Sequence, residues 1–181
     1  MGSLLFRFFI SGEEKEVLSG SELWELPLSG RKSSPIDTFA KTITTGDYFR
    51  AAAAFLSRQD YSALTKGLES FFQSPVPKSY LKDVSVFLEK HGAFYHPMKI
   101  LAGLNNSDSC SFVLNGAVSS QGLSLIETEY QLISGLNASF SKQYLPQVYA
   151  LDFIETSKTT IGFFLGEWFE GYKEFHITSD R

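Results

Sequence analysis

The sequence contains a single cysteine, Cys110, among 181 residues. One thiol excludes an internal disulfide and any cysteine-rich metal site, and it is compatible with a reducing compartment, so we expect a cytoplasmic protein. Basic residues are also few, because 16 lysines and arginines stand against 20 acidic residues and form no cluster. This balance argues against nucleic-acid binding, which depends on neutralising phosphates.

Long apolar runs are absent as well, since no stretch reaches the roughly 18 residues that cross a bilayer. The opening segment, MGSLLFRFFISGEEKE, has neither a basic leader nor a small-residue cleavage site. We therefore expect no membrane partner, and we interpret residues 4–10 as a β-strand that ends at Ser11 and Gly12.

Apolar and aromatic residues, by contrast, are plentiful. Hydrophobic residues make up 43% of the chain, with 17 phenylalanines and 8 tyrosines. Such a chain can bury enough apolar surface to offset the entropy lost on folding. Its length suits one core, or one domain with a small appendage, and we expect the second arrangement.

The first part of the chain predicts a helical appendage. After an irregular stretch rich in Gly, Ser and Pro, apolar residues recur at helical spacing in two blocks, DYFRAAAAFLSRQ and DYSALTKGLESFFQ. Asp47 and Asp60 stand where the N-caps of two helices are expected. We interpret this region as a helical hairpin, and the prolines within residues 74–79 indicate a domain boundary near residue 78.

Beyond residue 78 the apolar period shortens to that of strands. The segments DVSVFLEK, PMKILAG, CSFVLNGAV, QVYALDFIE and IGFFLGEW are β-rich, and one amphipathic helix, residues 121–136, separates the third from the fourth. The predicted fold is α+β. Residues 79–181 are expected to form a curved antiparallel sheet of about five strands with one packed helix, preceded by the strand, loop and helical appendage of residues 1–78.

The phrases EYQLISGL, LPQVYAL and FFLGEWFEG, in this order of elements, resemble the N-terminal lobe of the protein-kinase-like fold, in its aminoglycoside phosphotransferase and choline kinase branch. The resemblance covers residues 82–176. It implies a glycine-rich hairpin, a strand with a lysine, a helix whose glutamate pairs with that lysine, and a strand that enters the hinge beside adenine. It further implies a large helical lobe after the hinge, which carries the catalytic groups.

Glu129 is the residue of the predicted helix that most needs an explanation. At about 100° per residue it falls on the apolar side, between the directions of Ile133 and Leu136. A carboxylate in that position needs a partner. Either it bends to solvent or accepts a hydrogen bond from a neighbouring tyrosine, or it corresponds to the helix glutamate that the resemblance implies.

Two departures from the family pattern predict a degenerate nucleotide site. Asn115 occupies the lysine position and has no charge to offer Glu129 or a phosphate, and the nearest alternative cation is Lys99 on the preceding strand. The hairpin EKHGAFYHP has one glycine, the bulky Phe94 and Tyr95, and a proline without an N–H group. It is therefore a poor cradle for phosphate.

The segment that corresponds to the hinge allows two interpretations. Its backbone could hold a flat base on which Trp168 or Phe169 stacks, or these aromatics could close the core or dock a second lobe. Glu167 is expected on a solvated acidic face with Glu170 and Glu174, and not as a general acid or base. The candidate nucleotide-binding residues are Asn115, Glu129, Glu167, Trp168 and Phe169.

Other chemistry is weakly indicated. His91 and His96 lie five apart on a turn, which does not predict a metal site. Cys110 has no adjacent base that would lower its pKa. We assign no metal ligand, no nucleophile and no catalytic residue.

These features predict an N-terminal fragment or degenerate relative of a kinase-like phosphotransferase that is not catalytic on its own. No cofactor is expected, and ATP with magnesium only together with a second lobe, from a longer protein or a partner chain. The alternative is a non-catalytic protein-interaction or self-association module, such as a homodimer, that uses exposed aromatic surface. A third class is a small-ligand binding domain that uses the cleft beside the hinge.

Overall fold

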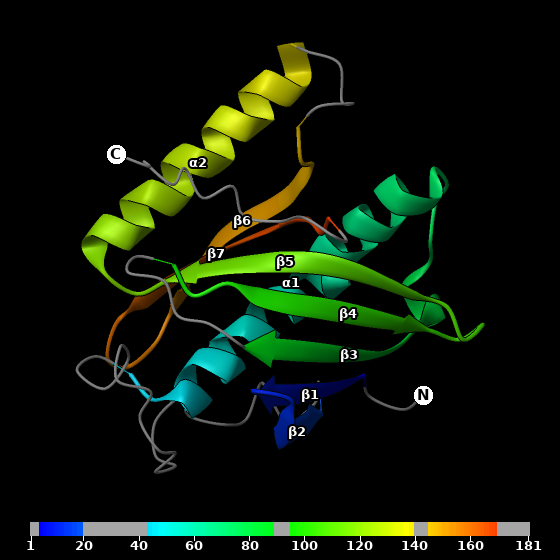
Figure 1. Ribbon diagram of the computed structural model, residues 1–181, viewed down its shortest axis with the longest axis horizontal. Coiled ribbons are helices and arrows are strands. Elements are labelled where there is room, and N and C mark those ends of the chain that lie inside the picture. Colours follow the sequence, from blue (N-terminus) through cyan, green and yellow to red (C-terminus); the bar gives the residue numbers. More distant parts are fainter. Residues whose placement is uncertain (1–3, 20–42, 89–94, 140–144, 170–181) are drawn as a thin grey trace, which may run out of the picture.

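The computed structural model describes residues 4–19, 43–88, 95–139 and 145–169, which form a seven-stranded mixed sheet and two α-helices (Figure 1). The strand order is β2-β1-β3-β4-β5-β7-β6. Neighbouring strands pair antiparallel except β1 and β3, which are parallel. The strands are β1 (Leu5–Ile10), β2 (Glu13–Ser19), β3 (Leu81–Leu88), β4 (Met98–Leu104), β5 (Ser109–Ala117), β6 (Val148–Glu155) and β7 (Thr160–Glu167).

The helices cover opposite faces of this sheet. Helix α1 (Thr45–Phe72) runs behind β3, β4 and β5 in Figure 1, and it shares one large buried cluster with strand residues such as Phe8. Helix α2 (Ser120–Ser139) packs on the other face. Successive residues of β7 show the division, because Phe163 belongs to the α1 cluster and Phe164 to the smaller α2 cluster.

Helix α1 begins at a capping box and bends in its middle. Thr44 is the N-cap, its side chain accepts from the Asp47 amide, and the Asp47 carboxylate accepts from the Thr44 amide. Asp47 is therefore the third helical residue and not the predicted N-cap. The second predicted cap, Asp60, lies inside a non-helical kink that spans residues 58–61. The expected hairpin is instead one kinked helix whose halves run in the same general direction (Figure 1).

The predicted sheet of about five antiparallel strands with one helix is wrong in its extent. The hairpin of β1 and β2 pairs with the edge of β3, so the N-terminal strand belongs to the same sheet and makes it mixed. An open sheet edge exposes unpaired backbone groups, and this hairpin covers the edge of β3. The α+β class is confirmed, and so is the element order from residue 79 onward: three strands, a helix and two strands.

Candidate functional site

A cleft of about 410 Å³ lies on the α2 face of the sheet, between helix α2, strands β5 and β7, and the segment that leads into β6. We call it the α2 cleft. Most of its lining is apolar. The lining residues are Val113, Asn115, Glu129, Ile133, Pro146, Gln147, Val148, Phe164, Gly166, Glu167 and Phe169.

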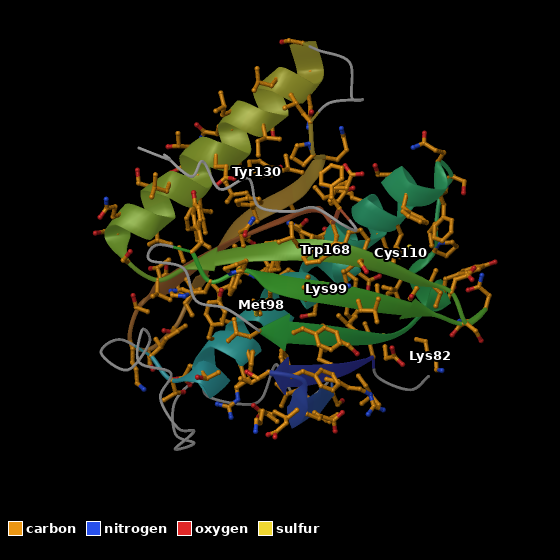
Figure 2. The ribbon with its side chains drawn as sticks, in the orientation of Figure 1. Lys82, Met98, Lys99, Cys110, Tyr130 and Trp168 are labelled. Carbon is orange, nitrogen blue, oxygen red and sulfur yellow. The ribbon has the colours of Figure 1, made fainter. Side chains whose placement is uncertain are left out.

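Four of the five residues selected from the sequence meet in this cleft. Asn115 comes from the middle of β5, Glu129 from α2, and Glu167 and Phe169 from the end of β7 and the residues after it. The fifth, Trp168, is not among the lining residues. Its ring lies under the ammonium of Lys99, with Nζ 4.9 Å from the ring centroid, and Figure 2 labels the two residues next to each other.

Glu129 is half-buried and accepts a hydrogen bond from the phenol of Tyr95. Burial raises the pKa of Tyr95, and the bond to Glu129 and the charge of that carboxylate raise it further. The tyrosine partner is one of the two alternatives that the sequence left open. Among the described residues no lysine or arginine forms a salt bridge with Glu129.

The sequence did not identify Tyr95 as the tyrosine that binds Glu129, because Tyr95 was considered only as a bulky residue that hinders phosphate binding in the hairpin. Its position is fixed by the residue that follows it. The amide of His96 donates to the Gly116 carbonyl at 2.8 Å, and Tyr48 Oη donates to the His96 carbonyl at 2.6 Å. These bonds connect the segment just before β4 with β5 and with α1. The side chain of Tyr95, in the same segment, packs against the α2 cluster.

Glu167 has a structural role at one end of the cleft. Its Oε2 accepts from the Gln147 amide at 3.0 Å, and its own amide donates to the Gln147 carbonyl at 2.8 Å. The carboxylate therefore fixes the start of β6. It is only partly exposed and not part of a fully solvated face, while Glu170 and Glu174 lie outside the described residues.

The polar side chains that line the cleft are of two kinds: the neutral amides of Asn115 and Gln147, and the carboxylates of Glu129 and Glu167. Gln147 Nε2 is buried and has no hydrogen-bond partner among the described residues. No lysine, arginine or histidine occurs among the residues that line the cleft, all of which belong to the described part of the chain. Lys99 is on the adjacent strand, paired in register with Val113, but its ammonium lies over Trp168.

Other reactive groups are buried or outside the description. Burial, with a smaller contribution from the charge of Asp108, raises the pKa of Cys110 to about 11, which disfavours the reactive thiolate. His96 is a buried core residue, and His91 is outside the described residues. Within the described ranges no three His, Cys, Asp or Glu side chains are grouped to hold a metal ion, and no helix is both long and apolar enough to cross a membrane.

Exposed aromatics, which the interaction-module hypothesis requires, occur at the far end of α1. Phe71 is 64% exposed and Tyr80 is 50% exposed. Tyr80 also lines a groove of about 450 Å³ with Phe72, Pro75 and Pro77. None of the residues selected from the sequence as candidate nucleotide-binding residues lines this groove, whereas four of them line the α2 cleft.

A scan against protein-family models finds no match, and a search of curated proteins finds no similar sequence. The interpretation of the cleft therefore depends on its own geometry.

Proposed function

We propose that this chain forms the nucleotide-facing lobe of a kinase-like phosphotransferase fold, with a degenerate nucleotide site and no catalytic activity of its own. The binding surface for an adenine-type ring is the α2 cleft. A second lobe, from a longer protein or a partner chain, would cover the cleft and supply the groups that phosphoryl transfer requires.

The connectivity around the cleft is the observation that carries the proposal. Strands β3, β4, β5, β7 and β6 are neighbours in that order and all antiparallel, and α2 connects β5 to β6. The hairpin β3–β4, the strand with Asn115, the helix with Glu129 and the strand that ends at Glu167 follow the order that the resemblance implies. Residues from the last three of these elements line one cleft.

The lysine–glutamate pair is the part of the site that has been lost. Asn115 has no charge, and the glutamate accepts from Tyr95 instead of from an ammonium group. In kinases this ion pair positions the nucleotide phosphates, so its loss removes a main contribution to productive ATP binding. We accordingly assign binding, and not catalysis, to the chain.

Amide chemical shifts of the labelled chain during titration with adenosine test the proposal. We expect shifts in the strands and helix that border the cleft. Phe169→Ala should weaken binding by on the order of tenfold, because stacking of a base on an aromatic ring contributes about 1–3 kcal/mol. Phe71→Ala is the matched control, since it removes an exposed phenylalanine away from the cleft and should leave the affinity unchanged.

Two results would contradict the proposal. Shifts that are absent, or confined to residues outside the cleft, would remove the binding site. Steady release of phosphate from ATP and magnesium by the purified chain, unaffected by Asn115→Ala, would show activity that this site does not supply.

A further inference from the structure

The charge of the α2 cleft points to a ligand class that differs from that of a working kinase site. We infer that the cleft selects an uncharged or cationic planar heterocycle, such as a nucleoside or a heteroaromatic amine, and disfavours the same ring when it carries phosphates. This inference rests on the proposed function, because it specifies the ligand of the same cleft.

The first support is the sign of the lining charges. Two carboxylates, of Glu129 and Glu167, border the cleft, and no cationic side chain occurs among its lining residues, all within the described ranges. Both carboxylates are partly withdrawn from water, where charges interact more strongly than at an open surface. A phosphate group in the cleft would meet two like charges, whereas a cationic ring would meet two opposite ones.

The second support is the set of neutral polar groups. The amide of Asn115 offers both a donor and an acceptor, and Gln147 Nε2 is a buried donor without a hydrogen-bond partner among the described residues. An unsatisfied buried donor is costly, and a ring nitrogen or carbonyl of the ligand would satisfy it. Aromatic nitrogen heterocycles present such acceptors at their edges.

The third support is the shape and the apolar walls. Val113, Ile133 and Phe164 provide aliphatic and aromatic contact, and Phe169, 45% exposed, stands at the end of the lining. A cleft of about 410 Å³ is within the size range of small-molecule sites. On this face Glu129 is hydrogen-bonded to the phenol of Tyr95. Because that partner is neutral, the negative charge of Glu129 is not compensated by it.

Calorimetry with adenosine, AMP and ATP on the full chain tests this inference, because the three probes share one ring and differ in phosphate charge. We expect affinity to fall in that order, with ATP on the order of tenfold weaker than adenosine at low salt. The difference should shrink at high salt, where the carboxylate charges are screened.

Two variants attribute the selectivity to the cleft. Asn115→Lys introduces a cation beside Glu129 and should strengthen ATP binding by about tenfold with little change for adenosine. Glu129→Gln removes one negative charge, keeps an acceptor for Tyr95 and should act in the same direction. Gln131→Lys adds the same charge on the exposed side of α2 and should change neither affinity.

The outcomes separate the inference from the proposed function. Tighter binding of ATP than of adenosine by the unmodified chain would overturn the inference and leave the proposed function standing. Unchanged selectivity in both Asn115→Lys and Glu129→Gln would also overturn it. Absence of binding for all three probes would overturn both.

Discussion

At the scale of single residues, the absence of a side chain at Gly116 allows Tyr48 of α1 to pack directly against β5 and to reach His96, just before β4. A Cβ at this position would lie 1.9 Å from Tyr48 Oη and 2.8 Å from a ring carbon of Phe163. The Tyr48 hydroxyl uses this space to donate to the His96 carbonyl at 2.6 Å. Because His96 directly follows Tyr95, this buried contact supports the hairpin residue that binds Glu129.

Gly116→Ala should therefore lower the free energy of unfolding by about 3 kcal/mol, because neither aromatic ring can move away in a packed core. Urea denaturation measures the loss. Combination with Tyr48→Phe, which removes the contacting hydroxyl, should cost less than the sum of the two single changes. Gly135→Ala in α2 is the control: nothing lies within 4 Å of its added Cβ, so it should stabilise the helix slightly. Equal effects of the two glycine changes would refute this account.

The candidate residues on regular elements could be predicted from the sequence, but their partners could not. Helical periodicity placed Glu129 on the apolar side of its helix, whereas Asn115 was selected only as the position that the resemblance assigns to the lysine; both residues line the α2 cleft. Tyr95 lies in a hairpin that has no period, so its bond to Glu129 depends on how β4 enters the sheet. Glu167 was expected on a solvated face, but its carboxylate is part-buried and accepts from the Gln147 amide. The two residues are 20 apart in the chain, so no local pattern indicates this bond.

At the scale of elements, the kink in α1 is strained. Gln59, Asp60 and Tyr61 have positive φ values of 49°, 58° and 64°. Residues other than glycine adopt this left-handed backbone conformation at a cost of about 1–2 kcal/mol each. The kink lets the second half of the helix follow the sheet, with Tyr61 and Leu64 buried.

Gln59→Gly should accordingly stabilise the protein, by about 0.5–1 kcal/mol, because the relief of strain exceeds the added flexibility of the unfolded chain. Glu69→Gly, at an exposed position in the regular part of the same helix, should destabilise it by about 1 kcal/mol. Thermal and urea unfolding of both variants provide the comparison. A loss of stability in both would mean that residue 59 is not strained.

Element prediction succeeded where the apolar period was clear and failed where tertiary pairing decided the outcome. The period of residues 121–136 predicted α2 to within a few residues. Strand β2 was missed because EEKEVLS is mostly charged, a composition that suits the edge of a sheet and lacks an apolar face. The parallel pairing of β1 with β3 joins segments about 80 residues apart, and no local pattern indicates it.

At the scale of the whole molecule, residues 1–78 and 79–181 contribute to one sheet and one large buried cluster. Phe8 of β1 is fully buried and stacks on Phe49 of α1 at 4.7 Å, and the cluster that contains both extends to Phe163 and Leu165 of β7. An appendage with its own core would lack this continuity. The shared core predicts that the two parts unfold together.

Phe8→Ala tests this directly, because it creates a cavity in the part of the core nearest the N-terminus. We expect a loss of about 3–5 kcal/mol, measured by amide hydrogen exchange, with the same loss of protection in β5 and β7 as in β1. Phe9→Ala is the matched control: its ring stacks on Phe87 at 4.7 Å but remains partly exposed, so the loss should be smaller.

Loss of protection confined to residues 1–78 would mean two independent units, and the α2 cleft would then keep its stability and ligand affinity in the Phe8→Ala variant. In a single cooperative unit, the apparent affinity of the cleft should instead fall once the unfolded fraction becomes appreciable, because ligand binding and folding are coupled.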